Sequence, residues 1–348
     1  MRRATLKDVA QLAGVSTATV SMVVNGKNIG RIPVDTRKKV REAANALGYR
    51  PDAFARGLAS GRSSIIGFLS DGVATSPFTG QMIRGAQDKA WRCGRILMII
   101  DTCGDRELER MAFDEMASHR VEGVLYSRWV HKEVTVPEQL LNFPSVLVNC
   151  FDTTKPILSV VPDEVQGGYN ATRMLLDQGH RKIALVLDPD PTPAFFGRLE
   201  GYRQALREAG IAFRPSLVLN AVGDQEGGYR VADALLATDA TGVFCYNDRT
   251  AMGLYDALRE RTVDVPSQMS VVGFDDQEVI AKHLHPPLST VALPQYELGV
   301  QGVRELLKVI KTSRTTVNAA HLEADSANPI IVKVSCNQVP RDSVARVD

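Results

Sequence analysis

The 348-residue sequence has little of what marks membrane, secreted or disulfide-bonded proteins. No apolar run approaches the roughly 18 residues that a membrane-spanning helix needs, and the first residues lack the apolar core of a signal peptide. The five cysteines are scattered and never form a C-x-x-C pair. They are therefore expected to be buried thiols in a reducing cytoplasm, because a disulfide or zinc framework uses closely spaced cysteines.

Motifs of catalysis are missing as well. The sequence has no Walker loop, no G-x-S-x-G, no H-E-x-x-H and no G-x-G-x-x-G after a predicted strand. His283 and His285 are close in sequence but have no nearby cysteine, so they are expected on the surface. The glycine pairs at 167–168 and 227–228 are weak phosphate-loop signals. We therefore expect no catalytic residue, no metal and no cofactor.

Charge is distributed unevenly, although the formal net charge is only +1. Residues 1–62 contain 12 Lys and Arg against 4 acids, a net charge of +8, whereas the rest of the chain contains 29 bases and 36 acids, a net charge of −7. A basic head on an acidic body predicts that the head alone binds a polyanion.

Short amphipathic helices are predicted in the basic head. Thr5 and Asp8 have the spacing of a capping box that opens the first helix, and Gly14 ends it. Ser16 can cap a second helix that runs to about Val24. A third amphipathic stretch follows, and two short helices joined by a glycine-containing turn with a third beside them predict a helix-turn-helix.

The second helix of such a motif enters the major groove of DNA. Its outward-facing residues are the candidates for reading bases, and they are Thr17, Ala18, Ser21 and Met22, with Asn25 at the end of the helix. The third helix, which follows Asp35, exposes basic side chains. A plain three-helix bundle has the same periodicity, so the charge asymmetry is what favours DNA binding.

Sequence motifs in the head resemble a known family. Thr5-Leu6-Lys7-Asp8-Val9-Ala10, Ala13-Gly14-Val15-Ser16 and Thr19-Val20-Ser21 are similar to the headpiece of LacI/GalR-family transcriptional regulators, and residues 49–58 are similar to the hinge helix of that family. The resemblance implies a hinge that folds on the operator and inserts Leu58 into the minor groove, beside Ala55 and Arg56. An ordinary linker is the alternative, because residues 59–64 have a linker-like composition.

The helices and the resemblance together give a set of predicted DNA contacts. They are Thr5, Ser16, Thr17, Ala18, Thr19, Ser21, Met22, Asn25, Lys27, Arg31, Tyr49, Ala55, Arg56 and Leu58. Met22 stands where the family often has Arg, so a bidentate contact to guanine is missing and the operator is expected to be atypical. The stretch 26–33 is longer than the compact turn of the family, and Lys27 or Arg31 can add a backbone contact.

The body alternates short apolar strands with helical stretches, a pattern typical of parallel sheets covered on both faces. Two such series predict two doubly wound lobes with a cleft between them. The predicted strands are 65–69, 96–100, 123–126 and 146–149 in the first series and 183–187, 243–246 and 271–274 in the second.

The resemblance extends through the body. Motifs at 178–184, 197–202, 246–253, 271–276 and 286–291 are similar to family motifs, and they imply a periplasmic-binding-protein-like α/β core behind an all-α helix-turn-helix headpiece. The expected boundaries are a headpiece at 1–50, a hinge at 51–63, an N-terminal lobe at 64–162 and 293–324, a C-terminal lobe at 163–292 and 325–340, and a tail at 341–348.

An effector is expected at the carboxyl ends of the strands, where they face the cleft. Position within the family motifs implies polar contacts from Arg198, Asn247, Asp248 and Asp275, and an aromatic platform from Phe78 and Phe196. This chemistry suits a polyol. The residues also allow structural roles: Arg198 can pair with Glu200, Asp248 and Asp275 can cap the next helix, and Phe195 and Phe196 can be core.

The resemblance implies a bacterial, cytoplasmic repressor that binds a pseudo-palindromic operator as a homodimer under the control of a small polar effector, a sugar or sugar derivative, with no membrane partner. The tail after Asn337 lacks leucine heptads, so a tetramer-forming extension is not expected. Two other classes share the α/β lobes: a sugar receptor without DNA activity and a nucleotide- or sugar-processing enzyme. Loss of DNA retention at low salt would favour the first and turnover of a bound sugar the second.

Overall fold

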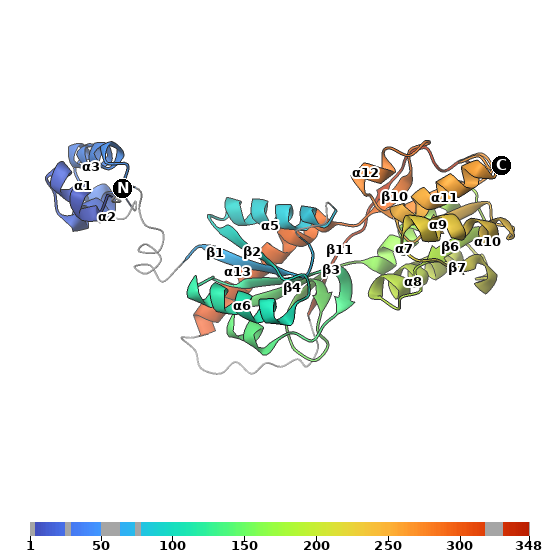
Figure 1. Cartoon of the computed structure of the whole chain (residues 1–348), viewed down its shortest axis with the longest axis horizontal. Coiled ribbons are helices and arrows are strands. Elements are labelled where there is room, and N and C mark those ends of the chain that lie inside the picture. Colours follow the sequence, from blue (N-terminus) through green and yellow to red (C-terminus); the bar gives the residue numbers. More distant parts are fainter. Residues whose placement is uncertain (1–3, 25–28, 50–62, 74–77, 317–329, 348) are drawn as a thin grey trace. The chain divides into compact units, whose positions relative to one another are not determined.

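The computed structural model describes residues 4–24, 29–49, 63–73, 78–316 and 330–347 (Figure 1). The chain separates into a helical headpiece and an α/β core, each considered by itself. Five of the predicted DNA contacts lie outside the described residues, and they are Asn25, Lys27, Ala55, Arg56 and Leu58.

The headpiece begins with two helices whose ends follow the sequence signals. It consists of α1 (Leu6–Ala13), α2 (Thr17–Val24), the 3-10 helix η1 (Ile29–Arg31) and α3 (Val34–Ala46). The predicted capping box is present: the Thr5 backbone N–H donates to Asp8 (2.7 Å), and the Asp8 N–H donates to the Thr5 hydroxyl (3.4 Å). Gly14 ends α1 at φ 67°, a conformation that glycine adopts without strain.

The headpiece core is small and made mainly of β-branched residues. Val9, Val20 and Val40, one from each helix, are fully buried against one another. The third helix starts at Val34, just before the predicted point, because Pro33 fixes the backbone that leads into it.

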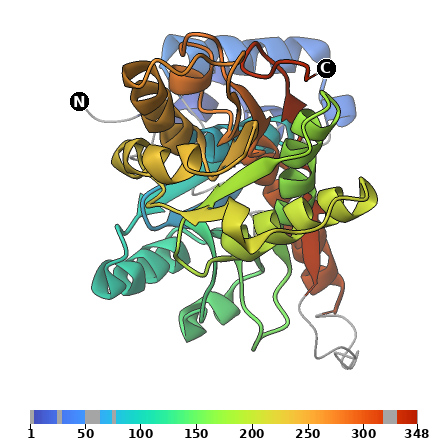
Figure 2. The same ribbon diagram turned by 90° about the vertical axis from the view of Figure 1, so that its right-hand side faces the viewer.

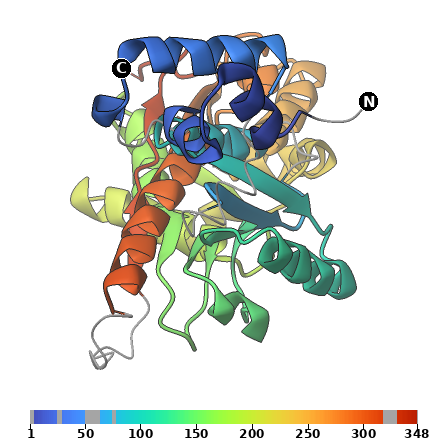
Figure 3. The same ribbon diagram turned by 90° about the vertical axis from the view of Figure 1, so that its left-hand side faces the viewer.

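The N-terminal lobe of the core has a sheet in the order β11-β5-β4-β3-β1-β2, in which the four pairs from β11 to β1 are parallel. Its elements are β1 (Ile65–Ser70), α5 (Gly80–Arg92), β2 (Ile96–Asp101), α6 (Arg106–Ser118), β3 (Val124–Glu133), η2 (Glu138–Asn142), β4 (Ser145–Phe151), β5 (Ser159–Pro162), α13 (Gln295–Thr316) and β11 (Ile331–Val334). Helices α5 and α13 cover one face through residues such as Met82 and Leu306. Helix α6 lies on the other side (Figure 3), where its Glu109 accepts a hydrogen bond from Tyr126.

The C-terminal lobe has a sheet in the order β12-β10-β9-β8-β6-β7. Its elements are α7 (Glu164–Leu176), β6 (Ile183–Leu187), α8 (Pro193–Glu208), η3 (Pro215–Leu217), β7 (Val218–Asn220), α9 (Gln225–Arg230), α10 (Ala232–Leu236), β8 (Gly242–Cys245), α11 (Asp248–Glu260), β9 (Ser270–Asp275), α12 (Glu278–Ala281), β10 (Ser289–Ala292) and β12 (Gln338–Val339). Helices α7 and α8 pack on one face and α9, α10 and α11 on the other (Figure 2). β12 pairs antiparallel with β10, and the other pairs of this sheet are parallel.

The chain crosses between the lobes three times within the described residues. It passes from β5 to α7, from β10 to α13, and from β11 to β12. The prediction that 325–340 belongs to the C-terminal lobe holds for β12 but is wrong for β11, because β11 pairs with β5 in the N-terminal sheet, with Val332 opposite Val160. The placement of β11 depends on its backbone hydrogen bonds to β5, which is distant in the sequence.

Two further expectations need correction. Residues 341–347 are built into the C-terminal lobe instead of forming a separate tail, since the Ser343 hydroxyl donates to the Val271 carbonyl. Of the cysteines, Cys150, Cys245 and Cys336 are buried as expected, but Cys103 is exposed and Cys93 is half-buried. None of the helices in the described part of the chain is both long and apolar enough to cross a membrane.

Candidate DNA-binding surface and ligand pocket

The exposed side of α2 combines capping residues with unengaged side chains. The Ser16 hydroxyl accepts from the Thr19 backbone N–H (3.1 Å) and lies 2.9 Å from the Thr19 hydroxyl, so both residues hold the start of the helix. Thr17 and Ala18 are exposed at the same end. The predicted base-reading positions therefore include residues whose side chains are not used to fold the headpiece.

The remaining described DNA candidates divide between surface and core. Arg31 is exposed at the end of η1, whereas Ser21 is half-buried. Met22 and Tyr49 are also half-buried and pack against the headpiece core, so each presents only part of its side chain to a partner. Thr5 is exposed and takes part in the capping box.

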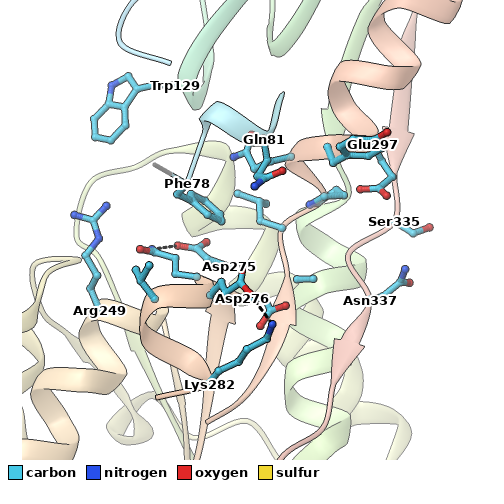
Figure 4. Close-up of a pocket in the computed structure, with 18 residues that line it drawn as sticks. Phe78, Gln81, Trp129, Arg249, Asp275, Asp276, Lys282, Glu297, Ser335 and Asn337 are labelled. Atoms are coloured by element: carbon cyan, nitrogen blue, oxygen red, sulfur yellow. Dashed lines mark hydrogen bonds and ion pairs between the residues drawn. The ribbon is translucent and has the colours of Figure 1, made fainter. Parts of the chain in front are cut away.

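A pocket of about 850 Å³ lies in the core (Figure 4). Residues of both lobes and of the crossing segments line it: Phe78, Gln81, Trp129, Arg249, Asp275, Asp276, Gln277, Glu278, Val279, Lys282, Ala292, Leu293, Pro294, Gln295, Tyr296, Glu297, Ser335 and Asn337. A movement of one lobe relative to the other would change the shape of this pocket.

Aromatic side chains of the N-terminal lobe form part of the wall. Trp129 is 45% exposed, and its backbone N–H donates to the Asp71 carboxylate (2.9 Å). Phe78 lies near Asp275, and Trp129 and Arg249 lie toward the same side of the pocket in Figure 4. Aromatic rings beside polar side chains suit a ligand with an apolar face and a hydroxylated edge.

Asp275 is the acid at the carboxyl end of β9. Its backbone has a φ of 106°, and its carboxylate accepts a hydrogen bond from the Gln277 side chain (2.9 Å). Burial raises the pKa of Asp275 to about 6, although Arg198 and the Gln277 hydrogen bond act in the opposite direction. Its neighbour Asp276 is paired with Arg341 (2.6 Å), so Asp275 is the less compensated carboxylate.

Arg198 does not line the pocket. It is 3% exposed and donates from Nε to Glu164 Oε2 (2.9 Å), and it also donates to the carbonyl of Tyr246. The expected alternative, Glu200, is not its partner, because residues two apart on a helix point in different directions. Burial alone would lower the pKa of Arg198, but Glu164, Tyr246 and Asp275 together outweigh it and the pKa is raised.

Asn247 and Asp248 also lie outside the pocket lining. Asn247 caps α11 by accepting from the Thr250 N–H (2.8 Å), and its amide donates to the carbonyl of Gly223. Asp248 is fully buried and accepts from the Thr290 hydroxyl (2.7 Å) and from the Gln277 N–H (2.6 Å). Burial raises the pKa of the Asp248 carboxyl well above its usual range.

Of the six predicted effector residues, the structure brings Phe78 and Asp275 together in the pocket. Phe196 is 59% exposed on α8 and stacks edge-on against Phe195, which is partly buried in the C-terminal lobe core. The prediction named Phe78 and Phe196 as an aromatic platform, whereas the pocket lining contains Phe78 and Trp129 but not Phe196.

Several lining residues escaped the sequence reasoning. Trp129 follows a predicted strand, so the rule that ligands bind at strand carboxyl ends could have found it. Arg249 is next to a predicted residue. Gln295 had no signal, since it opens α13 and belongs to no motif, yet it is 3% exposed and neither its amide nitrogen nor its amide oxygen has a hydrogen-bond partner. A buried amide of this kind is satisfied by a ligand or by water.

Comparisons with known proteins cover nearly the whole chain. Residues 5–52 match the family described as bacterial regulatory proteins, lacI family, and residues 172–344 match the periplasmic binding protein-like domain. The ribose operon repressor of Haemophilus influenzae is 33% identical over 322 residues, which cover 92% of this chain and 96% of that protein.

Solved structures agree with this assignment. The lac repressor dimer bound to operator and the anti-inducer ONPF matches with a TM-score of 0.78 at 25% identity, covering 99% of this chain and 100% of that one. The transcriptional regulator CelR in complex with cellobiose matches with a TM-score of 0.64 at 28% identity, covering 98% and 100%. The chain belongs to the LacI family of bacterial transcriptional regulators, which are DNA-binding proteins and not enzymes.

Proposed function

We propose that the protein is a repressor that binds a pseudo-palindromic operator as a homodimer, and that a sugar or sugar derivative in the pocket controls this binding. The observation that carries the proposal is the lining of the pocket. Residues of both lobes and of two crossing segments contribute to it, in a chain that also carries a helix-turn-helix headpiece. A ligand that contacts both lobes stabilises one arrangement of them over another.

DNA recognition is assigned to the headpiece. Basic side chains supply phosphate affinity that does not depend on sequence, and Thr17, Ala18, Ser21 and Met22 of α2 are proposed to read bases. Leu58 with Ala55 and Arg56 is proposed to add minor-groove contacts, as the resemblance implies. The protein would act in the bacterial cytoplasm, where operator DNA is found.

A sugar fits the chemistry of the pocket. Trp129 and Phe78 offer aromatic faces, and Asp275, Gln81 and Asn337 offer acceptors and donors for hydroxyl groups. The names of two related proteins mention a sugar, ribose and cellobiose. Arg198, Asn247, Asp248 and Phe196 remain proposed effector residues. The first three are held by hydrogen bonds within the C-terminal lobe, so their contact with a ligand would require rearrangement inside that lobe.

The N-terminal lobe exposes apolar surface that a second copy can cover. β2 is an edge strand of its sheet, and large apolar side chains are exposed on it and on the neighbouring helices α5 and α6. They are Trp91, Ile96, Ile99, Leu108 and Met111. Exposed apolar patches beside an unpaired edge strand are typical of interaction surfaces, and a dimer would place two headpieces on two half-sites.

Selection of genomic DNA fragments by the full-length protein tests the proposal. The selected site is then titrated with protein by fluorescence anisotropy, with and without a panel of neutral sugars. A pseudo-palindromic site whose affinity changes with one sugar is the expected result. By linkage, the operator must change the affinity for that sugar by the same factor. Salt-sensitive binding without a preferred sequence, or an operator affinity indifferent to every sugar that binds, contradicts it.

Substitution of Leu58 tests the minor-groove contact separately. Leu58→Ala is expected to weaken binding to the selected operator more than binding to unrelated DNA, because only specific complexes contain the inserted leucine. Equal losses on both kinds of DNA would count against the insertion.

A further inference from the structure

A buried ion pair joins α7 and α8 in the C-terminal lobe. Glu164 is 5% exposed, and its Oε2 accepts from Arg198 Nε. Glycines permit the close approach: a Cβ on Gly197 would lie 2.4 Å from the Cβ of Glu164, and a Cβ on Gly168 would lie 2.4 Å from the carbonyl oxygen of Arg198. The glycines at 168 and 197 therefore allow α7 and α8 to pack closely enough for Glu164 and Arg198 to pair.

The guanidinium of Arg198 lies over two aromatic rings. Its Cζ lies 3.7 Å from the centre of the Phe274 ring and 4.6 Å from that of the Tyr246 ring. Asp275 directly follows Phe274 and experiences the charge of Arg198. The guanidinium of Arg198 therefore interacts with the carboxylates of both Glu164 and Asp275, and it is hydrogen-bonded to Glu164.

The other charges of the pocket leave an acidic excess. The lining contains Asp275, Asp276, Glu278 and Glu297 against Arg249 and Lys282. Lys282 pairs with Glu278 (2.9 Å), and Asp276 pairs with Arg341 from outside the lining. Asp275 therefore lines the pocket, whereas the guanidinium of Arg198, which lies outside the lining, is paired with Glu164.

This balance of charge discriminates between ligands. A phosphate or carboxylate that leaves water needs charged donors that are free to pair with it. A neutral hydroxyl group instead donates to Asp275 and gains a charge-assisted hydrogen bond. We propose that Glu164 sets the charge class of the effector: by neutralising Arg198 it makes the pocket accept uncharged polyols and reject sugar phosphates and sugar acids. This inference rests on the proposed function of the pocket as the effector site.

Inorganic phosphate is a suitable probe, because it is anionic and its use does not require the effector to be identified. The full-length wild type, Glu164→Gln and the double variant Glu164→Gln with Asp275→Asn are titrated with phosphate by calorimetry at constant ionic strength. The expected order of affinity is wild type weakest, Glu164→Gln tighter by roughly tenfold, and the double variant tightest, because each step removes one negative charge beside Arg198.

Two controls separate this effect from a general change of charge. Glu200→Gln removes one negative charge from an exposed position of α8 and is expected to bind phosphate as the wild type does. Addition of Arg198→Met to Glu164→Gln is expected to abolish the gained binding. If Glu164→Gln does not fold, Glu164→Asp replaces it, since the shorter side chain withdraws the carboxylate from Arg198 and is expected to give a smaller gain.

The proposal is overturned if the wild type binds phosphate as tightly as Glu164→Gln, if Glu200→Gln gains as much, or if the gain survives Arg198→Met. The operator titration with neutral sugars reports on the proposed function independently. Neutral sugars that bind without changing operator affinity would refute the regulatory role of the pocket, whereas the phosphate series would still decide the role of Glu164.

Discussion

His131 and Glu164 connect the two lobes of the core through a single carboxylate, with His131 Nδ1 3.4 Å from Glu164 Oε1. His131 belongs to β3 of the N-terminal lobe, whereas Glu164 opens α7 immediately after the first crossing. The second carboxylate oxygen accepts from Arg198. Burial would raise the pKa of Glu164, but Arg198 and His131 outweigh it and the pKa is lowered. The carboxylate is therefore held as an anion from both lobes.

Arg198→Met is expected to destabilise the core strongly. The substitution leaves Glu164 buried without its main partner, and breaking a buried pair in this way costs about 3–5 kcal/mol. Arg198→Met combined with Glu164→Leu removes both charges and is expected to recover most of the loss. Urea unfolding of the two variants and the wild type measures this. A double variant no more stable than Arg198→Met would show that the loss comes from packing against Phe274 and Tyr246.

Asp275→Asn is expected to stabilise the protein at neutral pH. The pKa of Asp275 is raised from 3.8 to about 6, so in the wild type its contribution to stability falls as the pH rises between these values. Asparagine still accepts from Gln277 and carries no buried charge. We expect a gain of about 1–2 kcal/mol at pH 7 that disappears below about pH 4. Thermal unfolding across this range measures it, and a gain that does not vary with pH would contradict the assignment.

Ser16→Ala and Thr17→Ala form a matched pair on the headpiece. Ser16 caps α2 and Thr17 is exposed beside it. Loss of the cap is expected to cost about 0.5–2 kcal/mol of headpiece stability. Thr17→Ala is expected to leave stability unchanged and to weaken operator binding. Headpiece melting and anisotropy titration distinguish the two, and equal stability losses would show that Thr17 also supports the fold.

Gly14→Ala and Gly80→Ala test backbone conformation, since a Cβ at either position meets nothing within 4 Å. Gly14 has a φ of 67°, which costs an alanine about 1 kcal/mol or more, so the headpiece is expected to lose stability. Gly80 begins α5 and has no such restriction, so alanine is expected to stabilise the core by about 0.5 kcal/mol. Hydrogen exchange at the headpiece and core amides measures both changes.

Local signals in the sequence predicted the helix ends and the long strands, because a capping residue or an apolar run determines the backbone structure of the few residues around it. Contacts between distant residues were not predictable in this way. Glu164 precedes Arg198 by 34 positions, and no sequence pattern in either segment predicts that the two side chains pair. The choice of Asn247 over Asp248 as the cap of α11 depended on Thr290 and Gln277, which bind Asp248 from elsewhere in the lobe.

The pairing of β11 with β5 has a consequence for synthesis on the ribosome. Val332 is the partner of Val160, so the N-terminal sheet stays incomplete until β11 has been translated. Until then β5 presents an open edge, and unpaired edges in nascent chains favour association with other chains. Most of the C-terminal lobe, from α7 to β10, is made before that edge is closed, whereas β12 and residues 341–347 of this lobe follow β11. Closure of the N-terminal sheet is therefore expected to wait for synthesis of most of the C-terminal lobe, although strands β1 to β5 are translated earlier.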